Sequence, residues 1–130
     1  MPPDINDITY AIRGAIFEVN NVLGPGFLEK VYENSLLVEL VRRGYKAEAQ
    51  VPIKVQYKNI VVGEYFADLI VEHRVIIELK TVESLDRIHE AQLLNYLKAT
   101  GIKVGLLVNF KHQKADIKRL VFNLPEGHDD

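Results

Sequence analysis

The sequence contains no cysteine among its 130 residues. The chain can therefore form no disulfide, no thiolate metal site and no cysteine nucleophile. It also has no apolar run near the roughly 18 residues that a bilayer-spanning helix needs, and residues 1–4 lack the basic and apolar segments of a secretory signal. We therefore expect a cytoplasmic protein that does not contact a membrane.

An excess of positive charge is also missing, because 16 basic and 18 acidic residues give a net charge of −2. This balance argues against a generally basic nucleic-acid coat protein, but it allows acidic residues that bind a divalent cation beside a local basic rim. The four histidines show no paired zinc spacing, and no glycine-rich phosphate loop occurs. The length suits one hydrophobic core, so we expect a single domain over residues 1–130.

Apolar residues at spacings of three and four predict two helices in the first third of the chain. The first covers residues 5–23, and the turn at residues 24–26 then breaks it with glycine and proline. The second runs from about residue 28 to residue 43, with Gly44 at its end. Its expected apolar side consists of Leu28, Val31, Leu37, Leu40 and Val41.

Residues 47–80 are rich in branched and aromatic side chains, which is typical of strands. Turns at residues 58–59 and 72–74 divide this segment into a three-stranded meander. The pattern then predicts a helix over residues 86–100, strands over 104–110 and 118–124, and a polar tail over 125–130.

The second predicted turn brings two carboxylates together. With the turn centred on His73, Asp68 and Glu78 lie directly opposite each other on adjacent antiparallel strands. Their Cβ atoms are then about 5 Å apart, and like charges at that distance need a compensating group such as a divalent cation. Strand alternation places Lys80 on the same face as Glu78. A Glu-x-Lys spacing on its own is also explained by a simple ion pair, so the opposed aspartate carries the metal hypothesis.

Two helices carry further candidate residues. In the third helix, His89, Gln92 and Tyr96 form one polar stripe that either overlooks the acidic hairpin or faces solvent. In the second helix, Glu29 lies in the first turn with Tyr32 three residues later. An acid there either joins a functional site or stabilises the helix dipole. Lys111, Lys114, Lys118 and Arg119 are a basic group that contacts phosphate or remains a solvated surface.

Several ordered motifs resemble the GxxExxY protein family over almost the whole chain. They are Gly26-Phe27-Leu28-Glu29-Lys30-Val31-Tyr32, Gln50-Val51-Pro52, Gly63-Glu64-Tyr65-Phe66-Ala67-Asp68, Val75-Ile76-Ile77-Glu78-Leu79-Lys80, Gln92-Leu93-Leu94-Asn95-Tyr96-Leu97 and Gly105-Leu106-Leu107-Val108-Asn109-Phe110. That family is regarded as a branch of the PD-(D/E)XK nuclease superfamily. The resemblance implies an α/β fold with a restriction-endonuclease-like α-β-β-β-α-β core, in which helices flank a central mixed sheet.

The resemblance also implies roles for residues of the acidic hairpin and of the helix before it. Asp68, Glu78 and the backbone carbonyl of Leu79 would bind Mg²⁺ or Mn²⁺, and Glu29 would join the metal directly or through water. Lys80 would lie beside the attacking water.

The resemblance assigns substrate positioning to Gln92 and Tyr96 of the third helix, and we add Tyr32 and His89 as further candidates. One departure from the family pattern is that Ala67 replaces the proline that names the superfamily.

The leading functional hypothesis is Mg²⁺-dependent hydrolysis of phosphodiester bonds in DNA or RNA. One alternative is a catalytically weak or inactive nucleic-acid-binding or regulatory module of the same fold, because a fold does not establish an activity. Another is an interaction protein whose acidic cluster is only structural. With little chain left for a recognition domain, substrate choice would depend on short loops, a homodimer or a partner protein.

Overall fold

The computed structural model describes residues 3–123 and confirms the predicted order of elements. The last predicted strand begins two residues early and ends within the described part, while residue 124 and the tail at 125–130 lie outside it. None of the helices in this part of the chain has the length and apolarity to cross a bilayer. The elements are α1 (Ile5–Leu23), α2 (Glu29–Arg42), β1 (Ala47–Tyr57), β2 (Ile60–Val71), β3 (Val75–Lys80), α3 (Arg87–Thr100), β4 (Val104–Asn109) and β5 (Asp116–Val121).

The strands form one mixed sheet in the order β1-β2-β3-β4-β5. Only β3 and β4 pair in parallel, and α3 provides the crossover that a parallel pair requires. The other neighbouring strands pair antiparallel. The sheet with its flanking helices confirms the predicted restriction-endonuclease-like α/β fold.

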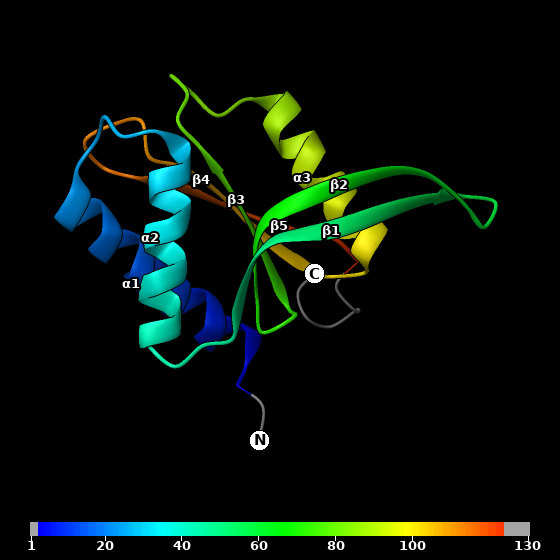
Figure 1. Ribbon diagram of the computed structural model, residues 1–130, viewed down its shortest axis with the longest axis horizontal. Helices are drawn as coiled ribbons and strands as arrows, with labels where there is room; N and C mark the ends of the chain where they lie inside the picture. The colour runs from blue at the N-terminus through cyan, green and yellow to red at the C-terminus, as the bar shows by residue number, and fades with distance from the viewer. Residues whose placement is uncertain (1–2, 124–130) are drawn as a thin grey trace.

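Helices cover both faces of the sheet, with α1 and α2 together on one side and α3 on the other (Figure 1). Alternate residues of the central strands therefore belong to two separate hydrophobic clusters. In β3, Ile77 and Leu79 pack toward α1 and α2, whereas Ile76 packs toward α3. Burial on both faces explains why β3 and β4 are apolar along nearly their whole length.

The predicted apolar side of α2 is partly wrong. Leu28, Val31 and Val41 are exposed, whereas Leu40 is buried as expected. Tyr32, Leu36 and Leu40, at four-residue spacing, face the sheet instead. Glu33, next to Tyr32, is also buried although it is acidic. The buried residues of α2 are Tyr32, Glu33, Leu36 and Leu40.

The β1–β2 hairpin extends beyond the rest of the sheet (Figure 1). Its turn residues Lys58 and Asn59 both have positive φ, as a tight hairpin turn requires, so the predicted turn is confirmed. On its other edge β2 pairs with β3 only through its last three residues, from Leu69 opposite Ile77 to Val71 opposite Val75. Asp68 is thus the first residue of β2 beyond the paired segment, and the candidate site lies where the two strands separate.

Candidate active site

Two carboxylates replace the main-chain ladder where β2 and β3 separate. The backbone amide of Asp68 donates a hydrogen bond of 2.9 Å to Glu78 Oε2. The backbone amide of Leu79 donates one of 2.8 Å to Asp68 Oδ2. Each carboxylate thus accepts an amide from the opposite strand, so the two acids lie side by side as the turn position predicted. We call this feature the acidic fork, defined by Asp68, Glu78 and the backbone of Leu79.

The acidic fork concentrates negative charge in a poorly solvated place. Glu78 is only 5% exposed. Burial, followed by the charge of Asp68, raises the pKa of Glu78 to about 8. Burial, with a smaller contribution from the charge of Glu33, also raises the pKa of Asp68, although the Leu79 amide and Lys80 oppose the shift. Ionising both acids is therefore unfavourable unless a cation compensates them.

The N-terminal half of α2 adds two more carboxylates. Burial and then the charge of Asp68 raise the pKa of Glu29, while Lys80 lowers it, which places Glu29 within electrostatic reach of both. Glu33 lies one turn later and is 4% exposed. It accepts hydrogen bonds from Lys30 Nζ at 2.7 Å and from Gln50 Nε2 at 2.9 Å. Our sequence interpretation did not include Glu33, although a spacing of four from Glu29 puts both on one helix side.

Gln50 is a second site residue that the predicted roles did not include. Its Nε2 bonds to Glu33 and lies 3.5 Å from Asp68 Oδ1, so it links α2 to the acidic fork. The residue lies inside β1 with a φ of 52°. This left-handed conformation costs a non-glycine residue about 1 kcal/mol or more. With this backbone conformation, the side-chain amide of Gln50 lies toward Glu33 and Asp68. The residue type alone does not predict the positive φ.

Substitutions at Gln50 test this strain. Gln50→Gly and Gln50→Ala both remove the amide, but only glycine adopts the positive φ without a Cβ penalty. We expect Gln50→Gly to be more stable than Gln50→Ala by about 1 kcal/mol in urea denaturation. At Glu48, which has no positive φ and lies on the same strand, the order should reverse. Equal or greater stability of Gln50→Ala would show that residue 50 is not strained.

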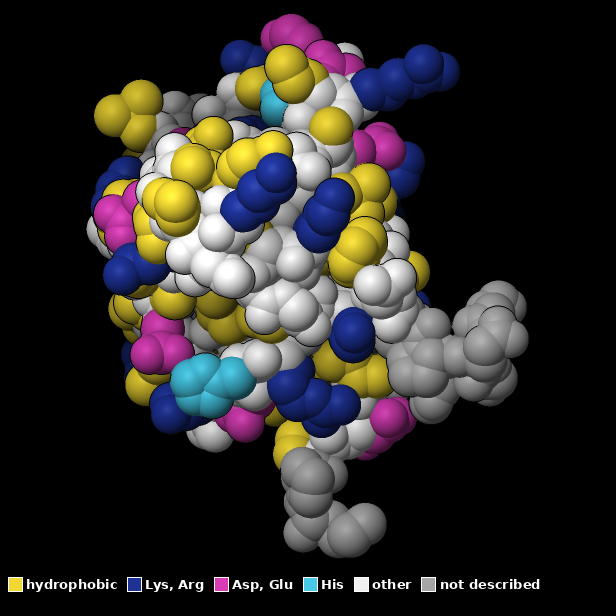
Figure 2. Space-filling model, turned by 90° about the vertical axis from the view of Figure 1, so that its right-hand side faces the viewer, with side chains coloured by type: hydrophobic (Ala, Val, Ile, Leu, Met, Phe, Trp, Pro, Cys, Tyr) yellow, Lys and Arg dark blue, Asp and Glu magenta, His cyan; other side chains and the backbone are white. Residues whose placement is uncertain are grey.

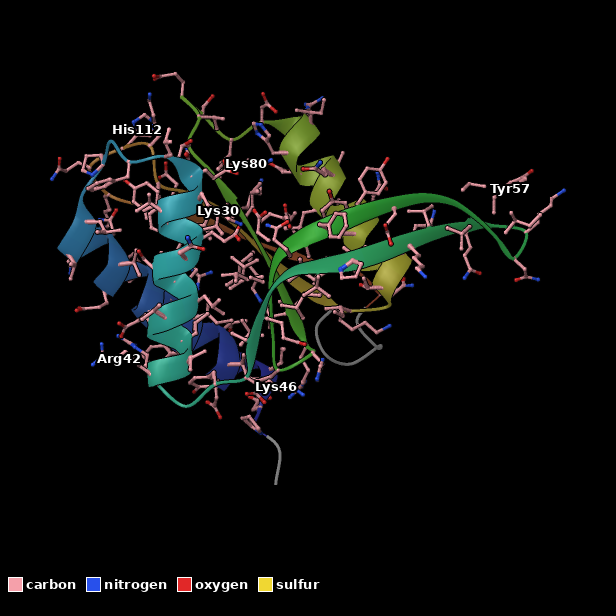
Figure 3. All side chains as sticks on the ribbon, viewed as in Figure 1. Lys30, Arg42, Lys46, Tyr57, Lys80 and His112 are labelled. Carbon is pink, nitrogen blue, oxygen red and sulfur yellow. The ribbon has the colours of Figure 1, made fainter. Side chains whose placement is uncertain are left out.

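Lys80 lies at the end of β3, between α2 and α3 (Figure 3). Its Nζ donates a hydrogen bond of 3.4 Å to Gln92 Oε1 on α3. The ion pairs found within residues 3–123 do not include one between Lys80 and Glu78, which removes the simplest alternative for the Glu-x-Lys spacing. Burial, followed by the charges of Glu78 and Asp68, raises the pKa of Tyr96 to about 12. Gln92 and Tyr96 therefore border the acidic fork from α3.

Two predicted positioning residues make structural contacts within the protein. Tyr32 is fully buried, its ring stacks on Phe110 with centroids 4.5 Å apart, and its hydroxyl binds the carbonyl of Gly24 and the amide of Phe27. The structure thus gives Tyr32 a packing role, and its part in substrate positioning stays a prediction. His89 Nδ1 accepts the backbone amide of Asp86 at 3.1 Å as part of a capping box at the start of α3. The structure thus gives His89 a capping role, and its contact with substrate stays a prediction.

Asn109 supports the segment that follows Lys80. This residue is fully buried at the end of β4. Its Oδ1 accepts the Val82 amide at 3.1 Å and its Nδ2 donates to the Val82 carbonyl at 2.7 Å. The pair of bonds holds the chain two residues beyond Lys80. In the C-terminal basic group, Lys118 pairs with Glu90 and Lys111 pairs with Glu83. Acidic partners therefore partly compensate the charge of these two lysines.

The donors at the acidic fork suit a hard divalent cation. Within residues 3–123 no three His, Cys, Asp or Glu side chains form a metal-binding group. The candidate donors are instead the carboxylates of Asp68 and Glu78 with the carbonyl of Leu79. This carbonyl points to the same strand edge as the Leu79 amide, which donates its hydrogen bond to Asp68. Glu29 is a further carboxylate nearby. An all-oxygen set of this kind fits Mg²⁺ or Mn²⁺ better than a softer metal.

Comparison with known proteins supports the fold and identifies the superfamily. No curated protein matches the chain. The crystal structure of SSO0001 is similar with a TM-score of 0.56 and 24% sequence identity, over 75% of this chain and 51% of that one. This chain thus spans about half the length of that protein, and the likeness concerns the fold alone. The family model of the PD-(D/E)XK nuclease superfamily matches residues 6–120, so the chain belongs to the PD-(D/E)XK nuclease superfamily.

Proposed function

We propose that this protein is a divalent-metal-dependent nuclease that hydrolyses phosphodiester bonds in DNA or RNA, within the GxxExxY branch of its superfamily. The observation that carries the proposal is that Asp68 and Glu78 each accept a main-chain amide of the opposite strand at the point where β2 and β3 separate. Main-chain amides hold both acids in place before any cation binds, so the donor set is preorganised. Membership of the superfamily supplies the reaction class.

The chain's own residues divide the work between binding and charge stabilisation. Asp68, Glu78 and the Leu79 carbonyl would hold Mg²⁺ or Mn²⁺, with Glu29 joining directly or through water. When bound, such a cation polarises the scissile phosphate and lowers the pKa of a coordinated water. Lys80 provides the positive charge that stabilises the negative charge developing on the phosphate, or orients the attacking water.

Residues on the two flanking helices position these groups. Gln92 Oε1 accepts a hydrogen bond from the Lys80 ammonium group and so restricts the position of the Lys80 charge. Tyr96 keeps its proton at neutral pH and can donate its hydroxyl to a phosphate oxygen. Glu33 orients Gln50, whose amide lies near Asp68. The cation ligands Asp68, Glu78 and Leu79 would therefore come from β2 and β3, and the substrate-facing groups from α3.

A cleavage assay on a substrate panel tests the proposal. Labelled single-stranded and double-stranded DNA and RNA are incubated with Mg²⁺ or Mn²⁺. We expect at least one to be cut, and cutting to stop with EDTA and in Asp68→Ala. Asp116→Ala, at an exposed position of β5, is the matched control and should retain activity. Confirmed metal binding without cleavage of any substrate would favour the binding-module alternative.

A further inference from the structure

A groove of about 880 Å³ lies between the β1–β2 hairpin and α3. One wall includes Lys54 of β1 and Tyr65 of β2, and the other includes Gln92, Asn95, Tyr96 and Lys98 of α3. Gln92 also contacts Lys80, and Tyr96 lies near the acidic fork, so the groove adjoins the candidate site. Gln92 and Tyr96 are the predicted site residues among its lining, and the rest of the groove had no predicted role.

The groove is basic although the protein as a whole is acidic. No Asp or Glu is among its lining residues, while both Lys54 and Lys98 are exposed, one on each wall. Figure 2 shows this side of the molecule, with basic and hydrophobic side chains over its centre and acidic ones toward its edge. On a chain of net charge −2, this local balance favours an anionic ligand along the groove.

The groove also offers an aromatic surface to that ligand. Tyr65 is 50% exposed, although a half-exposed tyrosine ring on a strand loses favourable apolar burial. Its ring is tilted against Tyr96 with centroids 5.7 Å apart, so one side is held while the remainder of the ring stays accessible. Exposed aromatic rings between lysines are the combination that binds the bases and phosphates of single strands.

The aromatic surface of the groove suits a single strand better than a duplex. The two walls of the groove touch where the ring of Tyr65 contacts the ring of Tyr96. The bases of a duplex are already stacked on one another, so an unpaired strand is the form that can place a base face against Tyr65. A single strand can follow the groove with its backbone near the lysines and a base against the Tyr65 ring.

We propose that the groove between the β1–β2 hairpin and α3 binds single-stranded nucleic acid, DNA or RNA, and delivers it to the acidic fork. Tyr65 is the stacking residue, and Lys54 and Lys98 bind phosphates from opposite walls. The proposal rests on the proposed nuclease function, because it names the form of substrate that this site receives.

Binding of the full chain in EDTA tests the groove separately from catalysis. The probes are fluorescein-labelled 12-nucleotide dT and rU strands and a 12-base-pair duplex, followed by anisotropy. We expect the single strands to bind more tightly than the duplex. Tyr65→Ala should weaken single-strand binding about 10-fold, whereas Tyr65→Phe should restore it because the ring does the stacking. Tyr57→Ala, at the exposed hairpin tip outside the groove, is the matched control.

A charge-reversal pair tests the lysines. Lys54→Glu/Lys98→Glu should weaken single-strand binding and, by removing two phosphate contacts, reduce the slope of log K against log salt by about 1.4. Arg42→Glu/Lys46→Glu changes the net charge equally at the end of the molecule opposite Lys80 (Figure 3) and should leave the slope nearly unchanged.

Three outcomes would overturn the groove proposal: no single-strand binding, tighter binding of the duplex, or equal effects of Tyr65→Ala and Tyr57→Ala. The assay contains no metal, so its result is independent of turnover. Single-strand binding that depends on Tyr65, without cleavage by any metal, would refute only the nuclease. Cleavage that is indifferent to Tyr65 and both lysines would refute only the groove.

Discussion

Replacing Lys80 with alanine is expected to lower phosphodiester cleavage by about 100- to 1,000-fold while leaving Mn²⁺ binding largely intact. The reason is that Lys80 lies beside the acidic fork without belonging to the oxygen donors, and its Nζ contacts Gln92 rather than Glu78. Its loss removes positive charge from the place where negative charge develops during the reaction. Calorimetry with Mn²⁺ and single-turnover cleavage measure the two properties separately.

Lys46→Ala is the control for Lys80→Ala, since Lys46 is an exposed lysine at the far end of the molecule (Figure 3). It should change neither Mn²⁺ binding nor cleavage. Unimpaired cleavage by Lys80→Ala would remove Lys80 from the mechanism. Loss of Mn²⁺ binding in that variant would instead show that Lys80 shapes the acidic fork itself.

Glu78→Gln is expected to stabilise the metal-free protein at high pH and to abolish Mn²⁺ binding. Burial and Asp68 raise the folded-state pKa of Glu78 from 4.5 to about 8. A raised folded pKa gives stability that is fully present below pH 4.5 and is lost as pH rises through about 8. Glutamine removes the ionisation but can still accept the Asp68 amide. In EDTA at pH 9 the variant should therefore exceed the wild type by about 2 to 5 kcal/mol in unfolding free energy.

Urea denaturation in EDTA at pH 5, 7 and 9 measures this effect. The wild type should lose stability over that range, and Glu78→Gln should lose less. Glu48→Gln, a half-exposed position of β1, should follow the wild type. Adding Mn²⁺ at pH 8 should raise the melting temperature of the wild type and not that of Glu78→Gln. A wild type with equal stability at pH 5 and pH 9 would contradict the proposed charge balance.

The acidic fork was predictable because it depends on local rules. A turn centred on His73 sets which residues of the two strands face each other, and strand alternation then places Lys80 with Glu78. Neither step needs knowledge of the rest of the fold. The same locality explains why α1, whose apolar residues recur at helical spacing, has the predicted bounds.

The α2 face and Gln50 were missed because they depend on tertiary contacts. Hydrophobicity favoured Leu28, Val31 and Val41, yet the side of α2 that reaches the sheet buries Glu33, whose charge is met by Lys30 and Gln50. Burial of a charged group against specific partners is not visible in apolar spacing. The strained conformation of Gln50 likewise exists only because the surrounding strands impose it.

The groove was missed because it depends on the unequal lengths of neighbouring strands. β1 and β2 continue well past the end of β3, and α3 crosses back beneath the part of the hairpin that β3 leaves uncovered. Runs of β-forming residues predict that strands exist, but they do not tell how many residues pair on each edge. Tyr65 and Lys54 therefore had no predicted role.

A crystal grown with Mn²⁺ and measured for anomalous scattering determines whether the acidic fork binds the catalytic cation. We predict an anomalous peak in contact with Asp68, Glu78 and the Leu79 carbonyl, and no peak there in Asp68→Asn. Full Mn²⁺ occupancy elsewhere with an empty acidic fork, or a peak that survives in Asp68→Asn, would contradict cation binding by the acidic fork.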